Sequence, residues 1–255
     1  MRRSVILAAA AVLALSAAGC SQEAPKEVAA APAGYAAALA EPSRPAEDRA
    51  RDAARHTEET LAFAQVQPGQ TIVDMIIGGG YFTRVFSAAV GPEGRVIAWQ
   101  PAELIAYQAS YGESLTAVDS LANVDALRSP RAAPVFPANV DLVFTAQNYH
   151  DLHLKANAAD TATRVNAAVF SALKPGGLYV VIDHNAAAGA PLTTSDTLHR
   201  IDIETVKREV LAAGFVLDGE SEVLANAADP LTTSVFDPAI QGRTSQFILR
   251  FRKPA

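Results

Sequence analysis

The chain has 255 residues, half of them hydrophobic, and its 21 basic and 27 acidic residues give a formal charge of −6. The basic residues are scattered along the chain, which argues against nucleic acid as a partner because phosphate binding needs grouped Lys and Arg. A single cysteine, Cys20, excludes an intrachain disulfide and a cysteine-cluster metal site.

The first twenty residues are typical of a secretory signal peptide. Arg2 and Arg3 precede an apolar stretch over residues 5–15, which is too short to span a bilayer. The following Leu-Ser-Ala-Ala-Gly-Cys resembles a bacterial lipobox, in which Cys20 is lipidated and becomes the mature N-terminus. The alternative is cleavage after a small residue that leaves Cys20 free.

We therefore predict a lipoprotein signal peptide over residues 1–20, a lipid anchor at Cys20 and no transmembrane helix in the mature form. The expected location is the cell envelope, on the periplasmic face of the outer membrane, because Ser21 is not the aspartate that often retains lipoproteins at the inner membrane. Residues 21–45 are rich in Ala, Pro, Glu and Ser, which predicts a flexible tether. Residues 46–255 then suit one α/β domain.

Strand and helix patterns alternate along this domain. The expected elements, in chain order, are a helix over 46–66, a strand over 71–76, a helix over 81–90, a strand over 94–99, a helix over 101–107, strands over 124–127 and 140–144, a helix near 165–173, a strand over 178–182, a helix after Asp202, and strands over 215–223 and 245–251. Such alternation predicts a Rossmann-like, doubly wound, mostly parallel sheet of about seven strands. The loop over residues 224–244 is long and is expected to be functional or packed on the domain.

Ligands bind such sheets outside the carboxyl ends of the strands. The predicted strand ends bring Asp74–Tyr81, Gln100, Asn148–His150 and Asp183–His184 to one rim of the sheet. At the first of these ends an apolar run that contains Asp74 is followed by three consecutive glycines and then by a helix. Bare backbone at such a turn lets a ligand approach closely.

Three stretches resemble the class I S-adenosylmethionine (SAM) methyltransferases: residues 65–74, residues 90–98, and Leu173-Lys174-Pro175-Gly176-Gly177 before the central strand. In that fold an antiparallel strand is inserted beside the fifth strand, which implies an antiparallel terminal hairpin here. A closer resemblance, to a bacterial family of predicted and often exported methyltransferases, is carried by residues 78–83, 147–151, 183–184, 198–202, 234–238 and 242–244. The resemblance implies SAM as the cofactor and a predicted methyltransferase activity with no settled substrate. We expect the substrate to be a small molecule.

The resemblance implies a set of site residues. The expected cofactor-binding residues are Asp74, Gly78, Gly79, Gly80, Tyr81, Gln100 and Asn148, and the expected catalytic residues are His150, Asp183 and His184. His150 is a possible general base, although a histidine in this place can also be structural. Asp74 can equally cap the glycine turn, the turn can exist without a ligand, and Tyr81 can simply pack its helix on the sheet.

Two positions depart from the family pattern. Ile76 stands where a glycine is common, and Gln100 stands where an acid usually binds the ribose hydroxyls. Glu103, nearby, is a possible substitute for that acid. These departures keep open a second reading, a methyltransferase-fold lipoprotein that binds a ligand or partner without catalysis. The spacing of the histidines and acids matches no metal motif, so we predict no metal ion.

Overall fold

The computed structural model describes residues 35–255. The predicted signal peptide, the lipid anchor at Cys20 and the first part of the predicted tether lie outside the described residues. Within residues 35–255, none of the helices combines the length and the apolar character that a membrane crossing requires.

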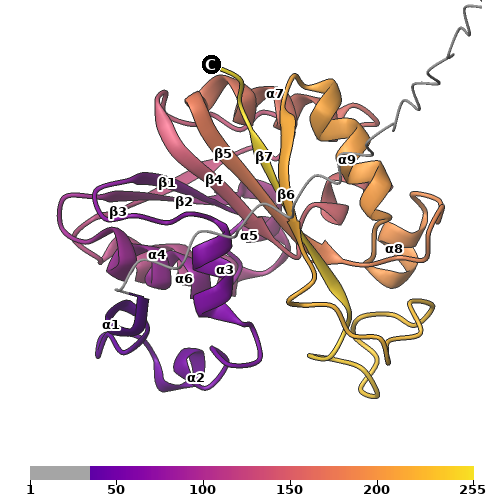
Figure 1. Cartoon of the computed structure of the whole chain (residues 1–255), viewed down its shortest axis with the longest axis horizontal. Helices are drawn as coiled ribbons and strands as arrows, with labels where there is room; N and C mark the ends of the chain where they lie inside the picture. The colour runs from indigo at the N-terminus through magenta and orange to yellow at the C-terminus, as the bar shows by residue number, and fades with distance from the viewer. Residues whose placement is uncertain (1–34) are drawn as a thin grey trace, which may run out of the picture.

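A seven-stranded sheet with the order β3-β2-β1-β4-β5-β7-β6 forms the centre of the molecule (Figure 1). The strands are β1 Thr71–Met75, β2 Arg95–Pro101, β3 Val124–Ser129, β4 Val140–Ala146, β5 Leu173–His184, β6 Val216–Ser221 and β7 Gln246–Arg252. Neighbouring strands from β3 to β5 pair in parallel, whereas β7 runs antiparallel to both β5 and β6. This confirms the predicted Rossmann-like sheet and its antiparallel terminal hairpin.

Helices cover both faces of the sheet (Figure 1). They are α1 Tyr35–Leu39, α2 Ala46–Arg49, α3 Thr57–Phe63, α4 Tyr81–Val90, α5 Ala102–Tyr107, α6 Ala109–Asp119, the 3-10 helix η1 His150–His153, α7 Thr161–Ala172, α8 Thr194–Leu198 and α9 Ile203–Ala212. One apolar core joins the sheet to α1, α3, α4 and α6, and a second joins it to α7 and α9. Successive side chains of a central strand point to opposite faces of the sheet and so enter different cores. In β4, Leu142 and Phe144 lie in the first core and Val143 lies in the second.

The predicted boundary of the domain at residue 46 is too late. Residues 35–45, assigned to the tether from composition, pack on the domain: the Tyr35 hydroxyl donates a 2.7 Å hydrogen bond to the carbonyl of Val66. Arg44 is 2% exposed and pairs with Asp52 at 2.7 Å. The helix predicted over 46–66 is also interrupted, because His56 adopts a left-handed conformation with φ of 44° between α2 and α3.

The elements that position the site follow the predicted pattern. Helix α4 begins at Tyr81, directly after the glycines, and ends before Gly91. Asp202 caps α9 by accepting a hydrogen bond from the backbone N–H of Glu204, as expected for an N-terminal aspartate. The long segment between β6 and β7 returns to the carboxyl end of β5, where it is held by the contacts described below.

Candidate functional site

The turn after β1 holds an isoleucine in a conformation that favours glycine. Ile76 has φ of 64°, which is costly for a β-branched side chain. Two hydrogen bonds of its backbone groups and the burial of its side chain hold it in this conformation. Its N–H donates to the carbonyl of Trp99 at 2.9 Å, its carbonyl accepts from the Asn148 side chain at 3.0 Å, and its own side chain is 3% exposed. Packing and hydrogen bonds therefore offset the backbone strain at this position.

The three glycines that follow have different surroundings. A Cβ atom added at Gly78 or Gly79 would meet no atom within 4 Å, so both residues border open space. A Cβ atom at Gly80 would lie 2.6 Å from the side chain of Val118 in α6. Gly78 and Gly79 are thus free to face a ligand, whereas Gly80 is needed for close packing.

Gln100, at the end of β2, holds the glycine turn through a hydrogen bond. Its side chain is buried, and its Oε1 atom accepts a 3.1 Å hydrogen bond from the N–H of Gly78. Its Nε2 atom has no hydrogen-bond partner among residues 35–255. Glu103, the possible substitute for the missing acid, instead accepts hydrogen bonds from the backbone N–H of Arg131 at 3.0 and 3.1 Å.

Asp74 contacts α4 rather than the amides of the glycine turn. Its carboxylate accepts a 2.6 Å hydrogen bond from the Thr83 hydroxyl and is almost completely buried. Burial raises the pKa of Asp74 to about 7, although the bonds from Thr83 act in the opposite direction. The carboxyl group is therefore poised between its neutral and ionised forms near neutral pH.

A cavity of about 220 Å³ lies beside the glycine turn. Its lining consists of Asp48, Arg51, Arg55, Asp74, Ile76, Ile77, Gly78, Gly79, Tyr81, Phe82, Ala146, Gln147 and Asn148. Five of the predicted cofactor-binding residues are in this lining, while Gly80 and Gln100 are not. Tyr81 also holds the N-terminal helices, because its hydroxyl lies 2.6 Å from the Thr57 hydroxyl and bonds the Asp52 carboxylate.

A larger cavity of about 370 Å³ adjoins the first one, and the two share five lining residues: Arg51, Arg55, Phe82, Ala146 and Gln147. Most of the rest of its wall comes from β5 and from the segment between β6 and β7, including His184, Phe236 and Thr244. Its volume lies within the range of about 300–1,000 Å³ that is usual for small-molecule sites. The long loop therefore contributes to a candidate binding site, as predicted.

Asp183 brings the three predicted catalytic residues together. Its fully buried carboxylate accepts hydrogen bonds from the backbone N–H of His150 at 2.7 Å, from that of His184 at 2.7 Å, and contacts Nδ1 of His150 at 2.8 Å. Burial raises the pKa of Asp183, but the adjacent His150 outweighs this effect and the net pKa is lowered. The carboxylate thus stays ionised.

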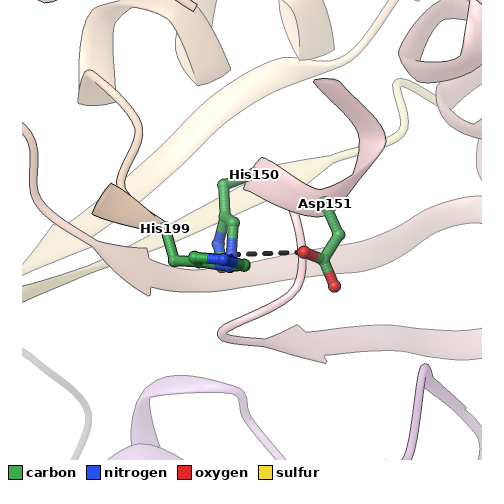
Figure 2. Close-up of side chains that lie close together, drawn as sticks. All are labelled: His150, Asp151 and His199. Atoms are coloured by element: carbon green, nitrogen blue, oxygen red, sulfur yellow. Dashed lines mark hydrogen bonds and ion pairs between the residues drawn. The ribbon is translucent and has the colours of Figure 1, made fainter. Parts of the chain in front are cut away.

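The two histidines held by Asp183 differ in position. His184 lines the larger cavity, and its Nδ1 atom lies 2.8 Å from the hydroxyl of Thr244. Burial lowers the pKa of His184 to about 4, so its imidazole is neutral at pH 7. His150 is in neither lining, although sequence analysis placed it toward the substrate. Its Nε2 atom instead faces Asp151 and His199 (Figure 2).

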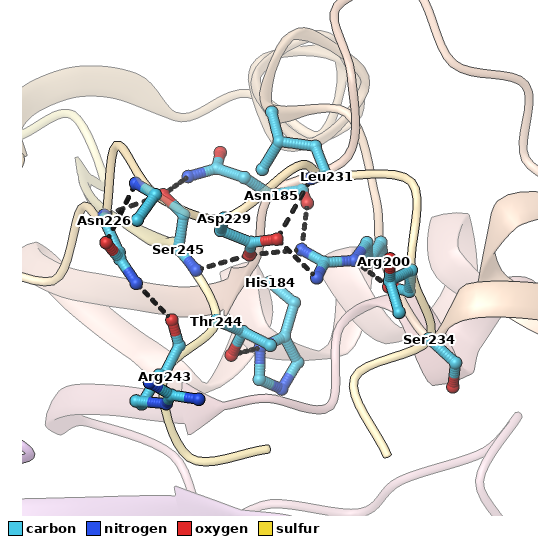
Figure 3. Close-up of polar contacts among 12 residues, drawn as sticks. His184, Asn185, Arg200, Asn226, Asp229, Leu231, Ser234, Arg243, Thr244 and Ser245 are labelled. Atoms are coloured by element: carbon cyan, nitrogen blue, oxygen red, sulfur yellow. Dashed lines mark hydrogen bonds and ion pairs between the residues drawn. The ribbon is translucent and has the colours of Figure 1, made fainter. Parts of the chain in front are cut away.

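A buried ion pair fixes the long loop over the larger cavity (Figure 3). Arg200 forms two hydrogen bonds of 2.9 Å with Asp229, and neither side chain is exposed. Asp229 also accepts a 2.7 Å bond from the N–H of Ser245, next to Thr244. This pair connects the segment before α9 to both ends of the loop.

The sequence did not point to Arg51 and Arg55, which line both cavities. The Arg55 guanidinium lies 4.6 Å from the ring centre of Tyr81, and burial lowers its pKa to about 10, with a further contribution from Arg51. Both residues lie in a segment predicted as an ordinary helix, more than 20 positions before the glycines. Only the tertiary structure brings them to the site.

No protein-family profile matches the chain, and no curated protein matches it either. Its structure, however, is similar to a SAM-dependent methyltransferase from Aquifex aeolicus, with a TM-score of 0.56 and 20% identity over 80% of this chain and 93% of that one. It is also similar to the putative methyltransferase in complex with the Trm112 activator of Haloferax volcanii (TM-score 0.58, 16% identity, 82% of this chain and 94% of that one).

The chain has the fold of the class I SAM-dependent methyltransferases. The same fold is present in the [4+2]-cyclase SpnF, with a TM-score of 0.56 and 16% identity over 80% of this chain and 81% of that one. The fold alone does not define a reaction, so the side chains that line the cavities must carry any statement about function.

Proposed function

We propose that this protein is a SAM-dependent methyltransferase that acts on a small molecule. The observation that carries the proposal is the continuity of the two cavities, which share five lining residues. SAM would occupy the cavity at the glycine turn, and the acceptor would occupy the larger one. The bound cofactor supplies an electrophilic methyl group on a sulfonium, and a reaction in this arrangement needs the acceptor atom in line with it.

The residues of the smaller cavity suit this cofactor. Gly78 and Gly79 leave bare backbone and open space on the side of the ligand. Asp74 can ionise when a cation arrives, because its pKa of about 7 is close to neutral pH. Arg51 and Arg55 offer guanidinium groups to a carboxylate, which planar guanidinium recognises well.

His184 is the residue best placed to act on the acceptor. Its neutral imidazole lines the larger cavity and is oriented by Thr244 and by Asp183, which bonds its backbone N–H. An unprotonated ring nitrogen can accept a hydrogen bond from a hydroxyl or amine and so orient it for attack. His150 and Asp183, the other predicted catalytic residues, would then position His184 and the end of β5 rather than touch the acceptor.

The decisive measurement is isothermal titration of the purified protein with SAM and, separately, with S-adenosylhomocysteine. The proposal expects a saturable one-to-one heat with both ligands. If neither ligand gives heat at millimolar concentration, the assignment of the cofactor is wrong. A screen of small-molecule acceptors that reads release of S-adenosylhomocysteine would then identify the substrate.

A second candidate function is ligand binding without methyl transfer. It is favoured by Gln100, whose oxygen already bonds Gly78 and therefore does not replace the usual ribose-binding acid. A protein that binds SAM or a larger ligand but releases no S-adenosylhomocysteine with any acceptor would support it.

We further propose that the protein is exported and lipid-anchored at Cys20, with the domain on the periplasmic side of the cell envelope. The lipobox-like sequence supports this location. Metabolic labelling with radioactive palmitate should mark the parent chain but not a Cys20→Ser variant, and membrane fractionation should show which membrane holds the protein. An unlabelled parent chain would contradict the lipid anchor.

A further inference from the structure

Three side chains with metal-binding atoms converge just beyond β4, and none of them is in the lining of either cavity. His150 Nε2 lies 3.2 Å from His199 Nδ1 and 3.3 Å from Asp151 Oδ1, and the three atoms all lie within 4.8 Å of one another. Figure 2 shows the two imidazole rings and the carboxylate directed toward one another. We propose that His150, Asp151 and His199 bind a divalent transition-metal ion of the zinc class and leave one coordination position open.

The separations of these atoms fit a small ion in tetrahedral coordination. Zinc binds imidazole nitrogen and carboxylate oxygen at about 2.0–2.1 Å, which puts neighbouring ligands about 3.4 Å apart in a tetrahedron. Two of the three pairs already lie at 3.2 and 3.3 Å. Two imidazoles and one carboxylate are also an established ligand set for ions that keep an open position.

Asp183 supplies an independent observation, because it orients His150 as metal-binding histidines are usually oriented. Its carboxylate lies 2.8 Å from Nδ1 of His150 and is fully buried. An Nδ1–H bond to a carboxylate fixes the ring and leaves the Nε2 lone pair for a metal. The same carboxylate also accepts from the backbone N–H of His150, which fixes the start of η1.

A positive charge between its members would stabilise the cluster. With the Nδ1 proton directed to Asp183, the Nε2 lone pair of His150 faces an oxygen of Asp151 at 3.3 Å, and two acceptors in contact repel each other. A second proton on His150 would relieve this repulsion for one pair. A metal cation would relieve it for all three ligand atoms and would displace that proton.

The proposed ion does not depend on SAM binding. Its position is nevertheless close to the wall of the larger cavity, because the His199 ring lies 4.7 Å from the ring centre of Phe236, which lines that cavity. Sequence spacing gives no sign of the site, since His150 and His199 are 49 residues apart. The fold brings them together by placing the end of α8 against η1.

The test uses the purified protein without a polyhistidine tag, stripped of metal with a chelator and then dialysed. Titration with Zn²⁺ should give one site per chain with a dissociation constant of micromolar or lower. Titration with Co²⁺ should give the visible absorption of tetrahedral coordination. His199→Ala and Asp151→Asn should each weaken Zn²⁺ binding by at least about 100-fold, and Asp183→Asn should weaken it by about 10–100-fold.

His56→Ala is the matched control, because His56 is a partly exposed histidine outside the cluster, and it should leave the affinity unchanged. Asp151→Asn keeps the shape of the side chain, so it decides the question even if His199→Ala fails to fold. A parent protein without stoichiometric Zn²⁺ binding would overturn the proposal. The proposal would equally be overturned if a folded Asp151→Asn protein bound Zn²⁺ as tightly as the parent.

Discussion

Arg200 and Asp229 form a two-bond ion pair that is closed to solvent on both sides and connects distant parts of the cavity wall. Two further donors of Arg200 are also used: Nε bonds the carbonyl of Thr233, and Nη1 bonds that of Asn185, each at 2.8 Å. Burial raises the pKa of Asp229, but the bonds from Arg200 and from backbone N–H groups outweigh this and lower the net pKa. The pair is therefore ionised, and Arg200 donates four hydrogen bonds within it and around it.

Asp229→Asn should destabilise the protein strongly, because it leaves the Arg200 charge buried without a counterion. Breaking a buried pair in this way costs about 3–5 kcal/mol. Urea unfolding would measure the loss. Asp125→Asn is the control, since the Arg95–Asp125 pair is about half exposed and should contribute less than about 1 kcal/mol. Equal losses in the two variants would contradict the role assigned to the buried pair.

Gly79 offers a direct test of the proposed cofactor cavity. A Cβ atom added at this position meets no atom within 4 Å, and Gly79 lines the cavity. Gly79→Leu should abolish SAM binding, with a loss of at least about 100-fold, while the unfolding free energy changes by less than about 1 kcal/mol. Gly79→Ala should cause a smaller loss of affinity. Titration and thermal unfolding would check both effects, and SAM affinity unchanged in Gly79→Leu would place the cofactor elsewhere.

The sheet, the glycine turn and the bounds of α4 could be predicted because local signals mark them. A β-branched run before the turn, three glycines in the turn and Gly91-Pro92 after the helix each restrict the backbone independently. The open space at Gly78 and Gly79 follows from the same local pattern. Elements of this kind can be predicted from a sequence because their local signals agree with the tertiary structure.

The first part of the domain could not be predicted in this way. Residues 35–45 have the composition of a linker, and tertiary contacts keep them on the domain, among them the hydrogen bonds from Tyr35 to Leu61 and Val66 and the contact of Arg44 with the Tyr81 ring. The positions of Arg51, Arg55 and His199 likewise depend on tertiary packing. No periodicity in the sequence distinguishes a side chain that faces a cavity from one that faces solvent.

Asp74 should make stability depend on pH. An aspartate in the unfolded chain has a pKa of about 4, whereas that of Asp74 is about 7 in the folded protein. Between these values the folded protein binds more protons than the unfolded chain, so the free energy of unfolding falls as pH rises. The loss is complete above about pH 7 and amounts to at most about 4 kcal/mol.

Asp74→Asn removes this dependence and keeps an oxygen that can accept from Thr83. The unfolding free energy of the variant minus that of the parent should therefore grow from pH 4 to pH 7 and then stay constant. Urea unfolding at a series of pH values would measure it. A difference that does not change between pH 4 and 8 would show that the carboxyl of Asp74 titrates normally.

His184 should affect turnover much more than cofactor affinity, because it lines the larger cavity and not the one at the glycine turn. With an acceptor identified by the screen, His184→Ala should lower kcat by about 100-fold, the loss that a misplaced reacting group can cause. The dissociation constant for SAM should stay within about twofold of the parent value. Thr244→Val, which removes the 2.8 Å contact that orients the ring, should reduce kcat by less. If His184→Ala kept the parent kcat, another group on the wall of that cavity would have to orient the acceptor.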